Sequence, residues 1–276
     1  MVSDLTIISV SYNSASVFLS NWKSFLDTTR YKIIIVDNAS IDDSVQILSR
    51  SFPEHHILKS ESNIGYGRAA NEGLQQCRSR FALLLNPDLM VSEELVTQLL
   101  TTAMEDEDNT AIWAPAITKA DFSGAQSVSI KAVSGAAMLF DLQKMNQVGF
   151  FDENIFLYSE ETDLCYRTRK KGYVIKLCPS VYIEHIGDSS SAHHHSLLYM
   201  KSWHFGWSRC YYLNKHSLYS QKYNPHRMYR NYMFKSYIGL NRINRLRYRG
   251  QAEGIKAFMR GEKAFKADGK PQQSPV

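Results

Sequence analysis

Cysteine is scarce in this sequence of 276 residues: there are only four, and none is spaced as a metal-binding or disulfide-forming pair. This scatter excludes a small disulfide-stapled domain and argues against a zinc cluster. We therefore expect reduced thiols, in the core or on neutral surface, in a cytosolic protein. The four residues are Cys77, Cys165, Cys178 and Cys210.

Long apolar runs are also missing. No stretch approaches the roughly 18 consecutive apolar residues of a membrane-spanning helix. The start at Met1–Asp4 leads directly into a strand-like segment and does not have the form of a signal peptide. We therefore expect a cytoplasmic protein. Apolar residues make up 44% of the sequence, which is enough for one large domain or two small ones.

Acidic residues are nearly absent from one part of the chain. Residues 199–266 contain 15 Lys and Arg but two Asp and Glu, a net charge of +13, whereas residues 1–198 contain 16 and 24, a net charge of −8. This asymmetry predicts an anionic partner for the C-terminal part. Nucleic acid is not expected, because the sequence contains no nucleic-acid-binding motif.

Aromatic residues recur at helical spacing in this basic part, beginning with Tyr199, Trp203 and Trp207. Surface helices that combine Arg and Lys with Tyr and Trp dock on anionic lipid, so contact with the inner membrane surface is one prediction. Two alternatives are a helix pair packed on the domain that precedes it and a contact between copies of the chain in a homo-oligomer.

Apolar runs alternate with amphipathic stretches in the first half, a pattern typical of an α/β sheet. Strands are expected at Thr6–Ser11, Lys32–Asp37, His56–Ser60, Phe81–Asn86, Ile112–Ile117, Ala136–Phe140, Tyr173–Leu177 and Val181–Glu184. Helices are expected at Ala15–Thr28, Asp42–Ser51, Tyr66–Arg78, Ser92–Met104 and Glu160–Lys171, with Asp42 and Ser92 as N-caps and Gly172 as a C-terminal stop. These elements predict a domain over residues 1–195, a basic aromatic helical extension over 196–267 and a flexible tail over 268–276.

Acidic residues stand at three positions where an open α/β sheet binds its ligands, beyond the carboxyl ends of the strands and near a helix start. Asp37 ends one apolar run, and Asp88 follows another. Glu160, Glu161 and Asp163 lie together at the start of a basic helical stretch. The three positions predict one site that holds a nucleotide, a metal ion and a general base.

Each of these residues also has a structural interpretation. Asp37 either binds a base or ribose or closes an Asx turn. Asp88 either binds a divalent cation with diphosphate oxygens or caps a helix. Glu161 is either a general base, a complement to the helix dipole or the ion-pair partner of Arg167. His185, after an apolar strand, is a metal ligand, a phosphate donor or a structural histidine.

Two glycines, Gly65 and Gly67, precede a helix, where backbone amides approach an anion closely. A dinucleotide fingerprint, Gly65-x-Gly67-x-x-Ala70, also fits, but such a fingerprint belongs at the first strand–helix turn. That turn reads Val10-Ser11-Tyr12-Asn13 and has no glycine. The alternative is a tight turn into the helix. A histidine run, His193–His195, is expected to be a solvated loop.

Seven segments in order resemble the family 2 inverting glycosyltransferases of the GT-A fold, particularly the bacterial rhamnosyltransferase-like branch. They cover about residues 5 to 190 and read Val10-Ser11-Tyr12-Asn13, Val36-Asp37-Asn38-Ala39-Ser40, Asn63-Ile64-Gly65-Tyr66-Gly67 with Asn71, Leu85-Asn86-Pro87-Asp88, Ser134-Gly135-Ala136-Ala137-Met138, Glu160-Glu161-Thr162-Asp163-Leu164-Cys165 and His185-Ile186-Gly187. The resemblance implies a Rossmann-like mixed sheet flanked by helices, with the basic helical segment as a C-terminal extension.

The resemblance also implies roles for these residues. Donor contacts would come from Asn13, Asp37, Asn63, Gly65, Gly67 and Asn71, with Asp37 at the base, and from Gly135 and Ala136 at the sugar and acceptor. Asp88 would hold Mg²⁺ or Mn²⁺, with His185 as a further ligand. Glu161 stands where the family places its catalytic Asp, so the base is open among Glu160, Glu161 and Asp163. The family's metal motif is often Asp-x-Asp, whereas the first position here is Asn86.

The implied activity is transfer of rhamnose or a related sugar from a dTDP- or UDP-sugar to a polyprenyl-diphosphate-linked glycan. Such a step belongs to bacterial surface polysaccharide synthesis, including lipopolysaccharide O-antigen or capsule, on the inner face of the cytoplasmic membrane. One alternative is a nucleotidyltransferase of related α/β fold, although the first strand–helix turn lacks the Gly-rich basic loop that this chemistry needs. Another is a nonenzymatic lipid- or nucleic-acid-binding protein that uses the basic helices.

Overall fold

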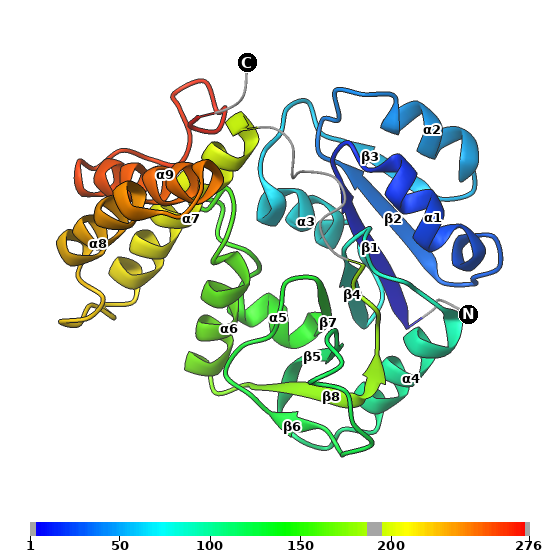
Figure 1. Ribbon diagram of the computed structural model, residues 1–276. Coiled ribbons are helices and arrows are strands. Elements are labelled where there is room, and N and C mark those ends of the chain that lie inside the picture. Colours follow the sequence, from blue (N-terminus) through cyan, green and yellow to red (C-terminus); the bar gives the residue numbers. More distant parts are fainter. Residues whose placement is uncertain (1–3, 187–194, 274–276) are drawn as a thin grey trace. The chain divides into compact units, whose positions relative to one another are not determined.

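The structure is a computed structural model that describes residues 4–186 and 195–273 (Figure 1). These residues form two compact units. The sheet unit contains residues 4–63, 68–151 and 161–186, and the helical unit contains 64–67, 152–160 and 195–273. Of the predicted histidine loop, His193 and His194 lie outside the described residues, as does Gly187 of the motif at His185. His195 is the exposed first residue of a helix.

The sheet unit is built on one mixed sheet of eight strands in the order β3-β2-β1-β4-β7-β5-β8-β6. The strands are β1 Leu5–Ser11, β2 Lys32–Asp37, β3 His56–Lys59, β4 Phe81–Leu85, β5 Thr110–Ala116, β6 Val128–Ser129, β7 Ala137–Asp141 and β8 Val174–Tyr182. The first four pair in parallel, and β7 runs antiparallel to both β4 and β5. The expected mixed sheet is confirmed, and the short β6 is an addition that the sequence pattern did not predict.

Helices cover both faces of this sheet (Figure 1). They are α1 Ala15–Leu26, α2 Ser44–Ser51, α3 Tyr66–Gln75, α4 Glu93–Met104, α5 Leu142–Val148 and α6 Glu160–Lys170. Apolar residues of α1, α2 and α4 share one core cluster with alternate strand residues such as Ile7 and Ile33. On the other face, a Cβ on Gly73 of α3 would lie 2.6 Å from Ile8, so the missing side chain lets helix and sheet approach.

Element ends follow the expected local chemistry in most places. The Ser92 hydroxyl caps α4 by accepting from the Leu95 amide, and Gly172 follows α6 with a φ of +86°. At α2 the N-cap is Asp43, one residue after the predicted Asp42, whose carboxylate instead accepts from the Ser44 amide. Helix α5, capped by Asp141, was not predicted.

Strand β8 is one element where the sequence pattern predicted two. Its pairing with β5 shifts between Pro115 and Ala116, which pair with Cys178 and Tyr182. Pro179 lies inside this irregularity and has no amide to donate to a sheet. The break in the pattern is therefore a bulge within a continuous strand.

All four cysteines are buried and free, as the scattered spacing predicted for core thiols. Burial raises the pKa of Cys77 and Cys165 to about 11 and that of Cys210 to about 12. The thiols are therefore protonated and unreactive at neutral pH.

The helical unit contains α7 His195–Lys215, α8 Pro225–Ile238 and α9 Arg242–Met259. Helices α7 and α9 cross at glycines: a Cβ on Gly206 would lie 2.1 Å from the Gln251 carbonyl oxygen, and one on Gly254 would lie 1.9 Å from that of Trp203. Gly250 and Gly254, four residues apart, therefore form a smooth strip on α9 that admits the backbone of α7.

The helically spaced aromatic residues of α7 pack inside this unit. Trp203 and Trp207 are buried in a cluster with Ala257, and the Trp207 Nε1 donates to the Glu262 carbonyl at 2.8 Å. These tryptophans therefore stabilise the helical unit itself and are not exposed for contact with a membrane. No helix within residues 4–186 and 195–273 has the length and apolar character needed to cross a bilayer.

The segment predicted as a flexible tail from 268 onward folds back over its described part. The Gln272 amide donates to the Ala264 carbonyl at 2.9 Å, and the Gln272 carbonyl lies 2.9 Å from Nε2 of the buried His204. Burial lowers the pKa of His204 to about 4, so this histidine is neutral at physiological pH. Residues 274–276 lie outside the described part.

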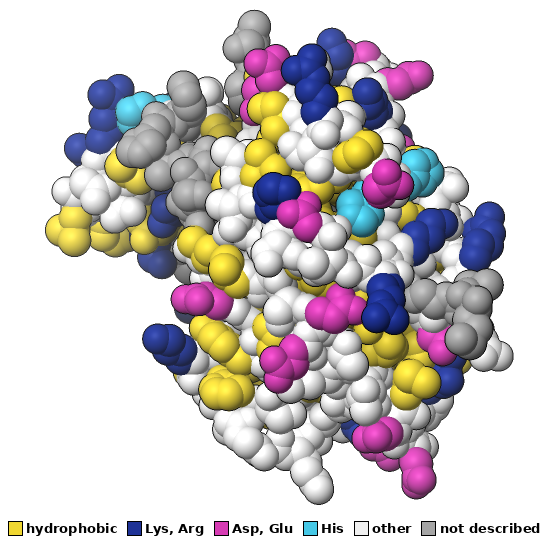
Figure 2. Space-filling view, turned by 90° about the vertical axis from the view of Figure 1, so that its right-hand side faces the viewer, with side chains coloured by type: hydrophobic (Ala, Val, Ile, Leu, Met, Phe, Trp, Pro, Cys, Tyr) yellow, Lys and Arg dark blue, Asp and Glu magenta, His cyan; other side chains and the backbone are white. Residues whose placement is uncertain are grey.

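The surface drawn in Figure 2 has Lys and Arg side chains interspersed with Asp and Glu. Such mixing is the usual state of a soluble surface and gives no field of one sign. The excess of positive charge is concentrated in residues 199–266.

Candidate active site

Three neighbouring parallel strands, β2, β1 and β4, end at the same edge of the sheet. Ser11, the last residue of β1, pairs in register with Asp37, the last residue of β2. The Asn38 amide continues this pairing by donating to the Ser11 carbonyl at 2.8 Å. The edge therefore brings together the ends of segments that are far apart in the sequence, as the strand-end rule predicted.

Asp37 is buried and closes a turn with Ser40. Its Oδ2 accepts from the Ser40 amide at 2.9 Å and its Oδ1 from the Ser40 hydroxyl at 2.5 Å. This is the Asx turn that the structural interpretation predicted. Ala39, inside the turn, has a φ of +62°, a strained value for a residue with a side chain. Any contact of Asp37 with a nucleotide would be additional to this turn, and a carboxylate has lone pairs for it.

Asn13 is tied to the same turn. Its amide donates to the Ser40 hydroxyl and its Oδ1 accepts from the Ile41 amide, both at 2.9 Å, while its φ is +50°. The Asn38 side-chain amide also donates to Asn63 Oδ1 at 3.2 Å. Of the predicted donor-binding residues, Asn13, Asp37 and Asn63 therefore lie in one hydrogen-bonded group around the end of β2.

Asn71 has a bidentate structural contact. Its Nδ2 donates to the Phe151 carbonyl at 2.9 Å, and its Oδ1 accepts from the Phe151 amide at 3.0 Å. Both partners are buried, so the side chain acts as a clip between α3 and the segment after α5. The structure gives Asn71 this role and shows no separate feature that directs it toward a ligand.

Gly65 is required by local packing in the helical unit. Its φ is +89°, and a Cβ there would lie 2.4 Å from the Phe156 carbonyl oxygen. The following amide, of Tyr66, donates to that oxygen at 3.2 Å. The tight turn into α3, which was the structural alternative, is therefore present, and Gly67 is buried in the first turn of the helix.

Asp88 and His185 lie side by side. Leu89 forms an isolated antiparallel bridge with His185, and the Ile186 amide donates to the Asp88 carbonyl at 3.1 Å. This backbone pairing brings His185 Nε2 to 3.1 Å from Asp88 Oδ2. Oδ1 of Asp88 is buried and has no hydrogen-bond partner among the described residues. A buried carboxylate oxygen without a donor is a free ligand for a hard cation.

A second contact path leads from Asp88 to Glu161. The Asn86 amide, two residues before Asp88, donates to the Ala136 carbonyl at 2.9 Å. Gly135 precedes Ala136, and a Cβ placed on Gly135 would lie 3.5 Å from the Glu161 Cβ. The predicted pocket residues Gly135 and Ala136 therefore lie between the end of β4 and the start of α6.

The three acidic candidates at α6 differ in environment. Burial raises the pKa of Glu161, against the opposing effect of hydrogen bonds from its own amide and Thr162. Asp163 is fully buried and accepts from Arg167 Nε at 2.7 Å. Glu160 is buried, is the first residue of α6 and belongs to the helical unit.

The structural alternative in which Glu161 pairs with Arg167 is wrong, because Arg167 pairs with Asp163. The arginine also donates from Nη1 to the Val148 and Gly149 carbonyls and from Nη2 to that of Phe150. The four-residue spacing of Asp163 and Arg167 is the signal that identifies this pair. Asp163 is thereby occupied in a structural clamp.

Ser40, like Arg167, has a role that the sequence did not predict. Its hydroxyl donates to Asp37 and accepts from the Asn13 amide, so it joins the ends of β1 and β2. The spacing of Asp37 and Ser40, three residues apart, is typical of an Asx turn and would have indicated it.

No group of three or more His, Cys, Asp and Glu side chains suited to a metal occurs in the described part of the chain. Among the described residues, Asp88 and His185 are the predicted metal ligands that lie together at this edge. A cation held by two protein ligands depends on its bound substrate for the remaining ligands, which is usual for Mg²⁺ with phosphates.

The sequence model of the family described as "Glycosyl transferase family 2" matches residues 6–165. The chain belongs to glycosyl transferase family 2. The match covers the ends of β1, β2 and β4 and the start of α6. Membership of a glycosyltransferase family argues against the nonenzymatic alternative and the nucleotidyltransferase alternative.

Curated relatives of this family 2 glycosyltransferase include two sugar transferases. One is the low-salt glycan biosynthesis hexosyltransferase Agl10 of Haloferax volcanii, 26% identical over 66% of this chain and 66% of the relative. Another is the N-acetylglucosaminyl-diphospho-decaprenol L-rhamnosyltransferase of Mycobacterium tuberculosis, 22% identical over 64% of this chain and 76% of the relative. The chain thus spans just under two thirds of the Haloferax protein.

Solved structures similar to this family 2 glycosyltransferase confirm the GT-A fold. The mannosyltransferase PcManGT from Pyrobaculum calidifontis, in complex with GDP-Man and Mn²⁺, has a TM-score of 0.60 at 14% identity and covers 96% of this chain and 77% of its own. S. aureus TarS 1–349 in complex with UDP has a TM-score of 0.55 at 13% identity, covering 94% and 92%.

Proposed function

We propose that this family 2 glycosyltransferase inverts the anomeric centre as it moves rhamnose or a related sugar from a dTDP- or UDP-linked donor to a polyprenyl-diphosphate-linked glycan. The observation that carries the proposal is the unsatisfied Asp88 Oδ1 beside His185, linked through Asn86, Ala136 and Gly135 to Glu161. The decaprenol-linked substrate in the name of the mycobacterial relative and the UDP bound to TarS support this acceptor and donor chemistry.

Asp88 and His185 fit a divalent cation. The buried Oδ1 of Asp88 has no hydrogen-bond donor within the part of the chain that the structure describes, and an imidazole nitrogen and a carboxylate oxygen both suit Mn²⁺. When bound, Mg²⁺ or Mn²⁺ supplies positive charge that stabilises the diphosphate leaving group. The Mn²⁺ in the PcManGT complex supports the choice of metal.

Glu161 is the general base in this proposal. An acceptor hydroxyl is a weak nucleophile until a base takes its proton during attack, and the Glu161 carboxylate receives that proton. The raised pKa of Glu161 makes it a better proton acceptor than an exposed carboxylate. Asp163 is less suited because Arg167 occupies its carboxylate. One base and in-line attack suffice for inversion, so no covalent sugar–enzyme intermediate forms.

The Asp37 turn is the nucleotide-binding element in this proposal. Its residues are held rigidly, so Asn13, Asp37 and Asn63 can offer polar atoms to a base and ribose without further ordering. Gly135 and Ala136 line the sugar. Gly65 and Asn71 contribute through local shape, since each is committed to a backbone contact.

A lipid-linked acceptor would bring the enzyme to the inner face of the cytoplasmic membrane, in lipopolysaccharide or capsule synthesis. The decaprenol-linked substrate in the mycobacterial relative's name supports an acceptor of this kind.

Thermal-shift measurements with a panel of nucleotide sugars, each with and without Mn²⁺, test the donor. We expect a dTDP- or UDP-sugar to raise the melting temperature selectively and only with the metal. NMR of the product then gives the anomeric configuration, which should be opposite to that of the donor. A product with the donor's configuration would contradict the inverting mechanism.

A further inference from the structure

The connection between α8 and α9 carries a cluster of exposed apolar side chains. Leu240, at the tip of the connection, is 98% exposed, and Tyr237 and Ile238 before it are 74% and 60% exposed. Phe234 and Ile243 extend the cluster onto the two helices. Several large apolar side chains exposed on one short connection indicate an interaction site.

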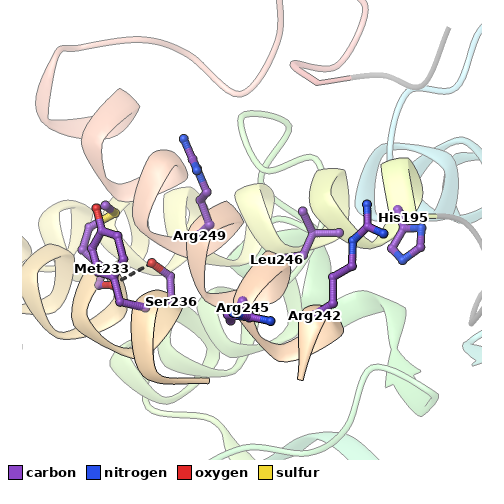
Figure 3. Close-up of a pocket in the computed structure, with 8 residues that line it drawn as sticks. His195, Met233, Ser236, Arg242, Arg245, Leu246 and Arg249 are labelled. Atoms are coloured by element: carbon purple, nitrogen blue, oxygen red, sulfur yellow. Dashed lines mark hydrogen bonds between the residues drawn. The ribbon is translucent and has the colours of Figure 1, made fainter. Parts of the chain in front are cut away.

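A cavity of about 330 Å³ opens beside this apolar tip, and its polar wall is basic. Arg242, Arg245 and Arg249 of α9 line it together with Ser236 of α8 and His195 of α7 (Figure 3). None of the three arginines has an ion-pair partner within the part of the chain that the structure describes. The cavity therefore presents guanidinium groups that can bind a phosphate by donating hydrogen bonds to its oxygens.

The positions of two of these arginines are unfavourable for the helix itself. Arg242 is the first residue of α9 and Arg245 lies one turn later, where the helix dipole favours acidic residues, and the first turn contains none. The Asn241 side chain already caps the helix by accepting from the Asn244 amide at 2.8 Å. Helix stability therefore does not explain the arginines, whereas binding of an external anion does.

We propose that the α8–α9 tip is a membrane-docking surface, in which Ile238 and Leu240 enter the bilayer interface while Arg242 and Arg245 bind phosphates of anionic phospholipids. The apolar and basic groups adjoin one another in the chain, which matches the apolar and charged layers at a bilayer surface. The net charge of +13 over residues 199–266 is complementary to an anionic leaflet. This surface is independent of the donor site and of the identity of the base.

The apolar tip distinguishes a membrane from two other occupants. Nucleic acid would be bound by arginines, but its charged backbone offers no apolar environment for the exposed side chains of Leu240 and Ile238. A second copy of the chain would bring two strongly basic surfaces together, and this is unfavourable. An anionic lipid surface can bind the arginines through its phosphates and bury the apolar side chains in its interface.

Co-sedimentation of the full-length protein with vesicles tests the proposal. Wild type should bind phosphatidylcholine vesicles that contain phosphatidylglycerol and should bind pure phosphatidylcholine far less. Ile238→Ser/Leu240→Ser should lower the partition coefficient roughly tenfold or more, because apolar insertion is lost. Arg242→Gln/Arg245→Gln should lower it about fivefold per arginine. Exposed matched controls in the sheet unit, Ile41→Ser and Arg50→Gln, should bind as wild type.

Several outcomes would overturn the proposal. One is equal sedimentation of the tip variants and wild type. Another is release of wild type from vesicles by inorganic phosphate at constant ionic strength. A third is a set of tip variants that lose binding to single-stranded RNA but still bind vesicles. Light scattering that shows a dimer broken by Leu240→Ser would assign the tip to a second copy. Circular dichroism melts of each variant verify folding, and normal transfer to a soluble acceptor keeps this test separate from the proposed activity.

Discussion

His185 Nε2 lies 3.1 Å from Asp88 Oδ2, although the two residues are 97 positions apart in the sequence. The bridge between Leu89 and His185 causes this proximity, because it aligns the segment after β8 with the turn after β4. The pair is thus built by backbone pairing, and its buried Asp88 Oδ1 remains available to a ligand.

Glu161→Gln should abolish sugar transfer and preserve donor binding. The amide keeps the shape of the side chain but cannot accept the acceptor's proton. Because burial raises the Glu161 pKa, the wild-type rate should fall as the pH drops through a value above that of an ordinary glutamate, and it should be constant above it. Initial rates across pH and calorimetry with the donor measure the two effects.

Glu160→Gln and Glu94→Gln are the controls for this substitution. Glu94 is exposed in the first turn of α4, where its carboxylate accepts a hydrogen bond from the Gln98 side chain, and its variant should keep the wild-type rate. If Glu161→Gln turns over normally and Glu160→Gln does not, the base is Glu160.

Asp152→Asn should remove an acid-dependent part of stability. Burial alone would raise the pKa of Asp152, but hydrogen bonds from Lys215 and Asn154 outweigh it and lower the pKa to about 2. A carboxylate whose pKa is lower in the folded state than in the unfolded state stabilises the protein at pH values above the unfolded pKa of 3.8. That stabilisation is lost as the pH falls toward 2. The contribution is roughly 2 kcal/mol at neutral pH.

Urea unfolding between pH 7 and pH 2 measures this effect. The wild type should lose roughly 2 kcal/mol more than Asp152→Asn over the acid range. Asp27→Asn breaks an exposed pair with Lys23 and should change stability by less than about 1 kcal/mol. Parallel pH curves for wild type and Asp152→Asn would show that the ion pair with Lys215 contributes nothing.

Asn71→Ala should lower stability rather than donor affinity. The change leaves the buried Phe151 amide and carbonyl without partners, which costs about 2–4 kcal/mol. The exposed Asn231→Ala should stay within about 0.5 kcal/mol of wild type. Unchanged unfolding with weakened donor binding would instead make Asn71 a donor ligand, as the motif alone suggested.

Gly254→Ala should destabilise the helical unit despite its higher helix propensity. Alanine gains about 1 kcal/mol within a helix. However, its Cβ would lie 1.9 Å from the Trp203 carbonyl oxygen, and separating α7 from α9 costs about 3 kcal/mol or more. Gly124→Ala, which meets nothing within 4 Å, is the matched control for thermal unfolding. An unchanged melting temperature for Gly254→Ala would refute the close helix crossing.

The sequence pattern predicted most of the sheet because each strand is a local apolar run. It divided β8 because Pro179 interrupts the pattern, and only pairing with β5 shows that the strand continues. It missed the close crossing at Gly250 and Gly254, although their four-residue spacing was visible, because a glycine strip indicates contact only once its partner helix is known.

The sequence predicted which types of residue form the candidate site and that they lie at the ends of strands. Asp88 and His185 were expected to share a ligand, and their proximity agrees with that expectation. The sequence could not distinguish Asp163 from Glu161, since the two differ in what surrounds them. Arg167 clamps Asp163, whereas burial without a cation raises the pKa of Glu161.

Calorimetric titration of the nucleotide-sugar donor into wild type and Asp88→Asn, with and without Mn²⁺, tests the central claim most directly. We expect wild type to bind at least tenfold more tightly with Mn²⁺, a difference of about 1.4 kcal/mol or more, and Asp88→Asn to lose that difference while its melting temperature stays near wild type. Equal enhancement by Mn²⁺ in both proteins would contradict a metal–diphosphate site at Asp88 and His185.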